Sequence, residues 1–393
     1  MTQVIGRVVL GGGLVWGLAV PAFGQTPEVL EAGPRFEAHV IAAELTGGYQ
    51  PVVVDLNRDQ RLDVIAVSTR LEELAWYESP DWQRHVLTTG LNRAINLAAE
   101  DLDGDGIPEL VLAHEFGTSH EGSLGILSLL THDGDPTMPW NRREIDRTPT
   151  AHRLRWADID GSGQKVLVNA PLVGAAAAPP EFRDATPLFW YRPGDWERRV
   201  VSRSDQGVVH GLLVKPWGDP SRDAVFSASF IGVHVHRFTD GEWNRRRLAS
   251  GDPASWPRSG SSEVEVGRVG DRAFITTIEP WHGDQVVVYR EENDVWQRQV
   301  IDSIGSGHTI VTADFDADGM DEIVTGDRGD TRRLYLYSLG GSDGVRWSRQ
   351  VLDDGDMSPS GCAVADMNAD DRIDLVCIGG GTANLKWYEN VTP

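Results

Sequence analysis

Three histidines of this chain occupy one repeated position in its sequence. His152, His210 and His308 each stand six residues before an Asp, or before the residue that aligns with that Asp, in separate copies of a repeat. Three neutral imidazoles that converge while one coordination position stays open have the composition of a catalytic zinc site. The spacing therefore predicts a metal or substrate site, provided that the fold brings the three positions together.

The repeat is marked by five short Asp-rich stretches, which start at Asp55, Asp101, Asp158, Asp314 and Asp366. Their spacing is close to a period of about 50 residues, which with strands on either side is typical of a β-propeller with one blade per repeat. In such a ring, one position of every repeat faces the same mouth of a central channel. The residues at the same position in the other four repeats are Tyr49, Ile95, Glu263 and Ser360.

A second signal supports this period: an aromatic residue followed two positions later by Arg on an outer strand. Its six copies begin at Trp82, Trp140, Trp196, Trp243, Trp296 and Trp347, and Phe36 begins a degenerate seventh. We predict an all-β chain, a seven-bladed β-propeller over 34–393 that an N-terminal strand (34–42) closes. The expected blades are roughly 46–88, 92–147, 150–203, 207–249, 260–302, 306–352 and 358–390. The outer arginines are expected to be charged edges that resist edge pairing.

A second ring of polar residues is expected at the same mouth, thirteen residues after the first Asp of each turn. It lies there because the first and second strands of a blade are antiparallel. This ring contains His114, His282 and Asp327, with Glu279 beside His282, and such groups suit proton transfer. The Gly/Ala/Pro-rich segments 115–125 and 175–187 follow second strands, so we expect them to wall a pocket or act as a lid.

The Asp-rich turns are candidates for calcium binding. Oxygen ligands at positions 1, 3, 5 and 9 of a tight loop suit a hard cation. The turn at Asp158 has Val166 at the ninth position and has lost that pattern. The predicted calcium ligands are Asp55, Asn57, Asp59, Asp63, Asp101, Asp103, Asp105, Glu109, Asp314, Asp316, Asp318, Glu322, Asp366, Asn368, Asp370 and Asp374. An Asp-rich turn without an ion is the alternative.

The net charge of the chain and its N-terminal segment indicate which partners the protein can bind and in which compartment it lies. The net charge of −23 argues against nucleic acid as a partner. Residues 1–24 combine Arg7, an apolar run and a small-x-small site, so they are expected to be a secretory signal peptide. A retained membrane anchor is the alternative. We expect a secreted or periplasmic protein, free of the membrane after cleavage, in which Cys362 and Cys377 form a cross-strand disulfide or stay as buried thiols.

Five motifs in series resemble the propeller of aldos-2-ulose dehydratase. They are Thr150-Ala-His152-Arg153-Leu, Val209-His210, Val266-Gly267-Arg268-Val269-Gly270-Asp271, Glu279-x-x-His282-Gly283 and Gly307-His308-Thr309, and the likeness covers about residues 46 to 350. The resemblance implies zinc in the propeller cleft and dehydration of a 2-keto sugar such as 1,5-anhydrofructose or glucosone.

Carried over by position, the resemblance implies that His152, His210 and His308 are the zinc ligands, and that His282 with Glu279 transfers protons. Arg153, His114 and Asp327 complete the candidate catalytic set. The family enzyme has cupin domains after its propeller, whereas this chain ends after its seventh blade. We therefore expect the reaction to stop at the dehydrated enone, or the substrate to be a different keto sugar.

The chemistry is consistent with these residue types. Zinc on a ketone oxygen acidifies the adjacent C–H, a His or Glu removes that proton, and the β-hydroxyl leaves. The leading hypothesis is an exported zinc-dependent carbon–oxygen lyase acting on a small keto sugar. The alternatives are a polysaccharide or glycoside lyase on the same scaffold, and a non-enzymatic propeller that binds carbohydrate or protein with calcium as its metal.

Overall fold

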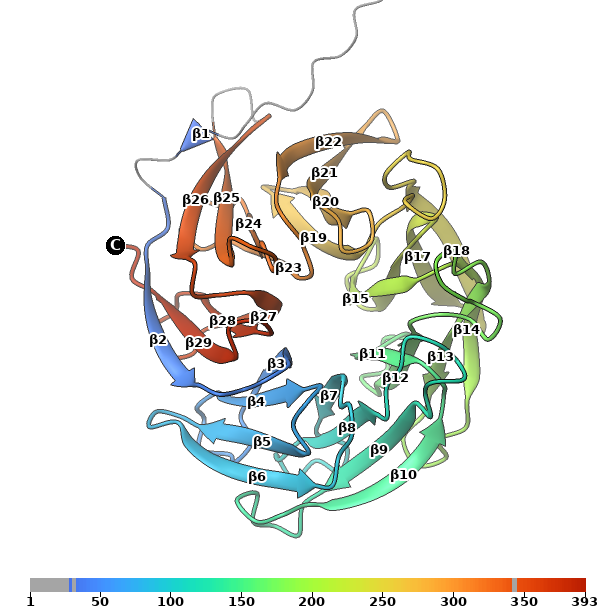
Figure 1. The fold of residues 1–393 in the computed structure, drawn as a ribbon, viewed down its shortest axis with the longest axis vertical. Coiled ribbons are helices and arrows are strands. Elements are labelled where there is room, and N and C mark those ends of the chain that lie inside the picture. Colours follow the sequence, from blue (N-terminus) through green and yellow to red (C-terminus); the bar gives the residue numbers. More distant parts are fainter. Residues whose placement is uncertain (1–27, 30–32, 341–344) are drawn as a thin grey trace, which may run out of the picture.

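The computed structural model describes residues 28–29, 33–340 and 345–393. Those residues form seven β-sheets arranged in a ring around a central axis (Figure 1). The prediction of an all-β, seven-bladed propeller is confirmed. The predicted signal peptide, residues 1–24, lies outside the described residues. Within the described ranges, no helix is long and apolar enough to cross a membrane.

Each blade has four strands, of which one lies nearest the axis and the others follow it outward in turn. The blades are numbered here in chain order. Blade one contains β3 (Gly48–Val54), β4 (Asp63–Ser68), β5 (Glu73–Glu78) and β6 (Gln83–Thr89). Blade two contains β7 (Asn96–Glu100), β8 (Glu109–His114), β9 (Ile126–Thr131) and β10 (Asn141–Arg147). Blade three contains β11 (Ala151–Ala157), β12 (Val166–Pro171), β13 (Ala185–Tyr191) and β14 (Arg199–Gln206).

The next three blades repeat this order. Blade four contains β15 (Val209–Pro216), β16 (Asp223–Ser229), β17 (Gly232–Thr239) and β18 (Glu242–Ala249). Blade five contains β19 (Glu263–Val269), β20 (Arg272–Glu279), β21 (Gln285–Glu292) and β22 (Val295–Ser303). Blade six contains β23 (Ile310–Ala313), β24 (Glu322–Gly326), β25 (Arg333–Gly340) and β26 (Arg346–Asp354), and β1 (Glu28–Val29) pairs in parallel with β26.

The seventh blade combines the two ends of the described chain. Its strands are β27 (Pro359–Ala365), β28 (Asp374–Gly379), β29 (Asn384–Asn390) and, on the outside, β2 (Phe36–Ala42). Strand β2 pairs antiparallel with β29, so that Phe36 lies opposite Asn390. The N-terminal strand therefore closes the ring as predicted. A disulfide joins Cys362 on β27 to Cys377, its direct partner on β28.

Apolar side chains fill the interfaces between blades. Ile65 and Trp76 of blade one, for example, belong to the same buried cluster as Leu110 and Leu130 of blade two. Because each sheet is covered on both faces, its second strand is buried along its whole length, as in β4. This explains why the second strands read as continuous apolar runs rather than as alternating ones.

The outer-strand arginines take part in the blade interfaces as well as lining exposed edges. Arg198 Nε lies 2.7 Å from Asp146 Oδ2, and the hydroxyl of Tyr191 donates to the same oxygen at 2.7 Å. Asp146 lies near the end of β10 in blade two. Tyr191 lies on β13 of blade three, and Arg198 lies in the connection from β13 to β14. The expectation that these arginines only shield edges was therefore incomplete. A similar arrangement joins Asp302 with Tyr337 and Arg349, and Asp205 with His236 and Arg245.

Candidate functional site

The inner strands bring the repeated histidine position together at one mouth of the ring. Strand β11 positions His152, β15 positions His210, and His308 lies two residues before β23. The ring centroids of His152 and His210 lie 4.9 Å apart, and those of His210 and His308 lie 4.8 Å apart. The convergence arises because the inner strands lie side by side around the axis (Figure 1).

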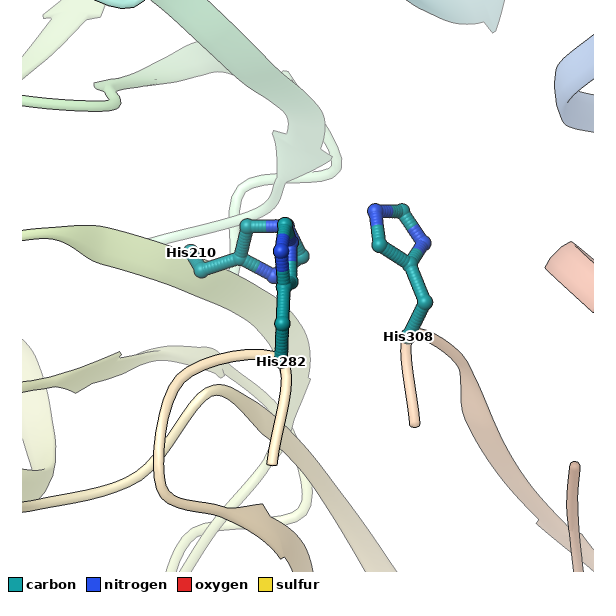
Figure 2. Close-up of side chains that lie close together, drawn as sticks. All are labelled: His210, His282 and His308. Carbon is teal, nitrogen blue, oxygen red and sulfur yellow. The ribbon is translucent and has the colours of Figure 1, made fainter. Parts of the chain in front are cut away.

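The group of imidazole nitrogens that could hold an ion consists of His210, His282 and His308 (Figure 2). One nitrogen of each side chain lies within 4.8 Å of the others. The Nε2 atoms of His210 and His282 are 3.1 Å apart, and the rings of His282 and His308 are 5.0 Å apart. His282 reaches this group from the connection between β20 and β21, where its φ is 49°. Three ring nitrogens therefore converge from blades four, five and six.

Two acceptors set the orientation and tautomer of the group. His210 Nδ1 lies 2.6 Å from a carboxylate oxygen of Glu263, and His308 Nδ1 lies 2.6 Å from the backbone carbonyl of Ser360. The carbonyl of Ser360 can only accept, so the proton of His308 lies on Nδ1 and its Nε2 keeps a lone pair. At His210, the Glu263 carboxylate favours the same tautomer, and Ser262 Oγ lies 3.3 Å from the same nitrogen. Metal-binding histidines typically make this kind of second hydrogen bond. The donor set therefore fits a borderline transition metal such as zinc.

His152 occupies a different place from the one that the resemblance implies. Its Nε2 atom lies 2.7 Å from the hydroxyl of Tyr49, and its Nδ1 is buried without a hydrogen-bond partner. The structure therefore places His282, and not His152, in the group of nitrogens that could hold an ion. The connection between β20 and β21 brings the Nε2 atom of His282 to 3.1 Å from that of His210.

Burial keeps the histidines neutral. It lowers the pKa of His152, His210 and His308 well below the usual range near 6.5, with Arg153 as a further cause for all three and Arg328 for His210 and His308. For His282, burial and then the Arg328 guanidinium lower the pKa to about 3. Neutral imidazoles are the form that binds a metal, so these surroundings suit ligation.

Arg153 ties the inner ends of the blades together behind the histidines. Its Nε donates to the backbone carbonyl of His210 at 3.0 Å, and its Nη2 lies 2.5 Å from Glu263 Oε1. Its guanidinium also lies over the ring of Tyr49, 5.4 Å from the centroid. Arg153 is buried, so its positive charge has a fixed position beside the carboxylate of Glu263 and the ring of Tyr49. Glu263 and Tyr49 share the repeated position, although sequence reasoning gave them no role.

Glu279 lies outside the histidine group. The residue is fully buried, and its carboxylate accepts hydrogen bonds from Ser261, Thr277 and Tyr289, at 3.0, 2.7 and 2.6 Å. It also accepts a bond from Arg298 Nε at 2.9 Å. The Tyr, acid and Arg side chains are of the same types as those at the blade interfaces, but here all three belong to blade five. The expected partnership with His282 in proton transfer is therefore not seen, because strand alternation turns Glu279 toward the blade interior.

The other two members of the second ring also face away from the group. His114 Nε2 lies 2.9 Å from Ser128 Oγ on the next strand of its own blade. Asp327 accepts bonds from the backbone N–H groups of Ser306 and Gly329 at 3.0 and 2.7 Å, and so fixes its own loop. These contacts are those of structural residues, in contrast to the catalytic roles expected for His114 and Asp327.

Two cavities border the histidine group. The central channel holds a cavity of about 510 Å³, whose lining includes Tyr49, Arg153, Glu263 and His308. A second cavity of about 440 Å³ lies at the mouth and includes Trp281 and His282 in its lining. Two members of the group, His308 and His282, are therefore each in contact with a space that a small molecule can occupy.

The long segments at the mouth form an aromatic wall, as the sequence suggested. Phe182, within 175–187, packs edge-on against Trp281 with ring centroids 5.5 Å apart. Phe230 and Trp256 continue the same cluster, with centroids 5.1 Å apart. Phe116, within 115–125, packs against this cluster and lies 5.5 Å from the ring of His152.

The Asp-rich turns lie at the opposite ends of the inner strands, and two of them gather acidic ligands. The groups are Asp101 with Asp103 and Glu109, and Asp314 with Asp316 and Glu322. Burial, followed by the neighbouring carboxylates, raises the pKa of Glu322 to about 8. A divalent cation would relieve that crowding of negative charge, so the donor set fits calcium.

The first and last turns differ at the ninth position, where Asp replaces Glu. Asp63 bonds the backbone N–H groups of Leu56 and Ser79 through its two oxygens, at 3.0 and 2.9 Å. Asp374 bonds Met367 and Asn390 in the same way, at 3.0 and 2.7 Å. The third position of these turns is also different, since it is Asn57 or Asn368 rather than Asp, so the acids of the turns at Asp55 and Asp366 do not form such a group among the described residues.

Comparison with known proteins supports the resemblance seen in the motifs. A family model described as the β-propeller domain of aldos-2-ulose dehydratase matches residues 124–292, and one for an FG-GAP-like repeat matches 55–112. The first range contains His152, His210, Glu263 and His282. The resemblance to that propeller family is therefore confirmed.

Individual relatives agree with this result. Aldos-2-ulose dehydratase of Phanerodontia chrysosporium is 26% identical to the chain, over 57% of the chain and 28% of the relative's own length. The chain thus matches less than a third of that protein. Among solved structures, the Dos1 propeller superposes with a TM-score of 0.54 and 10% identity, over 86% of this chain and 78% of that one. This likeness supports the propeller fold alone.

Proposed function

We propose that this protein is a carbon–oxygen lyase that removes water from a 2-keto sugar such as 1,5-anhydrofructose or an aldos-2-ulose. The proposal rests on the similarity to the aldos-2-ulose dehydratase propeller and above all on one observation. Nitrogens of His210, His282 and His308 lie within 4.8 Å of one another, and acceptor oxygens of Glu263 and Ser360 lie 2.6 Å from the Nδ1 atoms of His210 and His308. Such a set of imidazoles is suited to zinc.

Bound zinc would polarise the ketone carbonyl and so acidify the neighbouring C–H bond. The protein's contribution is a neutral ligand set, a fixed positive charge and a proton-transfer pair. Arg153 and Arg328 place positive charge near the group, as their effect on the histidine pKa values indicates. That charge stabilises the enolate that forms when the proton leaves carbon.

Tyr49 and His152 are the proposed proton-transfer pair. Their polar atoms are 2.7 Å apart, and Tyr49 borders the channel cavity. Burial raises the pKa of Tyr49, so its hydroxyl stays protonated and can donate to a leaving hydroxyl. Burial lowers the pKa of His152, so its imidazole is neutral and can accept a proton. The proton taken from carbon leaves with the hydroxyl as water, so that no net proton is consumed.

The proposal assigns zinc binding and proton transfer to different histidines. The metal content of variants tests this assignment. Wild-type protein should contain about one zinc per chain, whereas His210→Ala/His308→Ala and His282→Ala should lose it. His152→Ala should keep the zinc yet lose the enone absorbance produced from 1,5-anhydrofructose. His114→Ala is the matched control, since His114 is a buried histidine that bonds only within its own blade.

The opposite results would favour other functions. Calcium as the only metal, unchanged by the histidine variants, would favour a propeller that binds carbohydrate or protein without catalysis. Zinc loss in His152→Ala but not in His282→Ala would restore the ligand set that the resemblance implies.

Calcium and export complete the proposal. The turns that contain Asp103 and Asp316 bind calcium as a structural ion. The protein is exported, with residues 1–24 removed, and meets its small carbohydrate substrate in the periplasm or outside the cell. N-terminal sequencing of the exported protein tests this, because the proposal requires a first residue at or near Gln25.

A further inference from the structure

We propose that the cavity at the mouth is a subsite for one neutral sugar ring, which stacks on Trp281 while the reacting carbons reach the histidine group. This inference rests on the proposed function and defines its substrate class more narrowly. The mouth cavity is defined by its lining, Pro180, Phe230, Pro257, Arg258, Pro280, Trp281, His282, Gly283, Asp284 and Gly305.

The mouth cavity adjoins the reaction centre directly. His282 belongs both to its lining and to the group with His210 and His308. A ligand in this cavity is therefore in contact with one of the three imidazoles. The volume, about 440 Å³, falls within the range of pockets that hold small organic ligands.

The aromatic floor is held in place by its neighbours. The indole of Trp281 lies 4.8 Å from the imidazole of His282, centroid to centroid, with the planes 36° apart. Phe182 meets Trp281 edge-on, and Phe230 lies 6.0 Å from it. A ring fixed in this way loses little freedom when a ligand stacks on it, which favours binding of the apolar face of a sugar.

The charges on the rim favour a neutral ligand. The cavity is lined by one cation, Arg258, and one carboxylate, Asp284, and both side chains are exposed. Each can bond hydroxyl groups without imposing a net charge. The nearby guanidinium of Arg183 lies over Trp256 and pairs with Glu181, so it adds no unbalanced charge either. A chain of uronic acids needs an excess of positive charge, which this rim lacks.

The channel cavity is a poorer candidate for this role. Most of its charged side chains already have partners, as Arg153 has in Glu263 and Lys165 in Glu100, while Arg155 donates to the backbone carbonyl of Leu154. A sugar that entered there would have to compete with these ion pairs, whereas the mouth offers an aromatic surface and two exposed polar groups.

Binding of 1,5-anhydroglucitol tests the proposal, because this sugar alcohol lacks the ketone and does not react. Calorimetry and tryptophan fluorescence should detect binding to the wild-type, zinc-loaded protein. Trp281→Leu should weaken binding by about tenfold or more and raise KM for 1,5-anhydrofructose with little change in kcat. Trp217→Phe is the matched control, since Trp217 packs between Phe226 and Trp296, outside the mouth.

Because Trp281 packs in a hydrophobic cluster, a second variant protects the test against misfolding. Arg258→Gln changes an exposed side chain and should weaken binding of 1,5-anhydroglucitol by several-fold at an unchanged melting temperature. Unaltered affinity in both Trp281→Leu and Arg258→Gln would overturn the subsite. So would tight binding of an oligogalacturonide by a protein that does not bind the neutral sugar.

The subsite and the proposed function fail in different ways. If zinc and dehydration are found but both variants keep their sugar affinity, the lyase stands and the subsite is wrong. If the neutral sugar binds and both variants lose it, yet no zinc or dehydration is found, the subsite stands and the protein is a sugar-binding propeller.

Discussion

The Nε2 atom of His210 lies 3.1 Å from the Nε2 atom of His282, although 72 residues separate the two in the chain. Two neutral ring nitrogens at this distance share at most one hydrogen, and the contact of His210 Nδ1 with Glu263 leaves the lone pair of His210 Nε2 directed inward. The ring nitrogens of His210 and His282, together with that of His308, are therefore arranged so that they could bind a cation or a proton.

Replacing Glu263 should weaken the metal site without removing a ligand. In Glu263→Gln, the acceptor for His210 Nδ1 loses its charge, so zinc affinity should fall by about 10- to 100-fold. Competition with a zinc-binding dye measures this. Glu265→Gln is the control: the same change two residues along β19, where the carboxylate bonds Lys215 instead. Equal zinc affinities in the two variants would contradict the role of Glu263.

Glu279 should matter for stability rather than for chemistry. Glu279→Gln leaves Arg298 without its charged partner in the interior of blade five, which should cost on the order of 3 kcal/mol of unfolding free energy. Urea denaturation measures this cost, and zinc content should not change. If instead Glu279→Gln folded with full stability and lost activity, Glu279 would be the proton-transfer group that the sequence suggested.

The outer part of blade four should make the ring sensitive to acid, in addition to the histidine group at the mouth. His236 is fully buried near Asp205, and burial lowers its pKa to about 4. Burial also lowers the pKa of His234 to about 4, with Arg245 as the next cause. Since an unfolded histidine titrates near 6.5, the unfolded chain binds more protons between these values. Stability should therefore fall as pH drops from about 6.5 to about 4.

The repeat supplies a variant that checks this acid sensitivity. The residue that pairs with the outer-strand Arg is Tyr289 in blade five and Tyr337 in blade six, where His236 stands in blade four. His236→Tyr should flatten the dependence of unfolding free energy on pH by an amount on the order of 3 kcal/mol. His236→Gln serves if tyrosine does not fit. An unchanged slope in both variants would exclude His236 as the cause.

Calcium should bind at two turns and stabilise the fold. Asp103→Asn and Asp316→Asn should each remove one ion, whereas Asp160→Asn, in the turn with Val166 at its ninth position, should remove none. At a calcium concentration 100 times Kd, each ion contributes about 2.7 kcal/mol to stability. Thermal unfolding with and without a chelator measures the effect. Equal calcium content in all three variants would contradict this assignment.

The sequence was sufficient to predict the ring, its seven blades and its closure, because strand period and the Trp-x-Arg signal repeat along the chain. It also placed His152, His210, Glu263 and His308 at one mouth, since equal positions in equal repeats must converge. It also placed His282 at that mouth, but it could not show that His282 rather than His152 completes the group with His210 and His308. That depends on the path of the loop after β20, which the repeat does not specify.

The second ring was less predictable for a related reason. Strand alternation decides whether a residue near the end of a second strand faces the channel or the blade interface, and one position of error reverses the face. Glu279 and His114 face the interior of their blades, where Arg298 and Ser128 contact them. Asp146, Asp205 and Asp302, which bind outer arginines, were missed because each acid and its arginine belong to different blades.

The pairing of β2 with β29 joins residues about 350 positions apart in the chain. During synthesis, the first strand of the ring therefore emerges long before its partner exists, and its edge must wait unpaired while six blades form. Long-range contacts of this kind slow folding, so assembly of the seventh blade is expected to be the late step. Until then the channel is open along one side, and the histidines of blades three to six can assemble before the ring is complete.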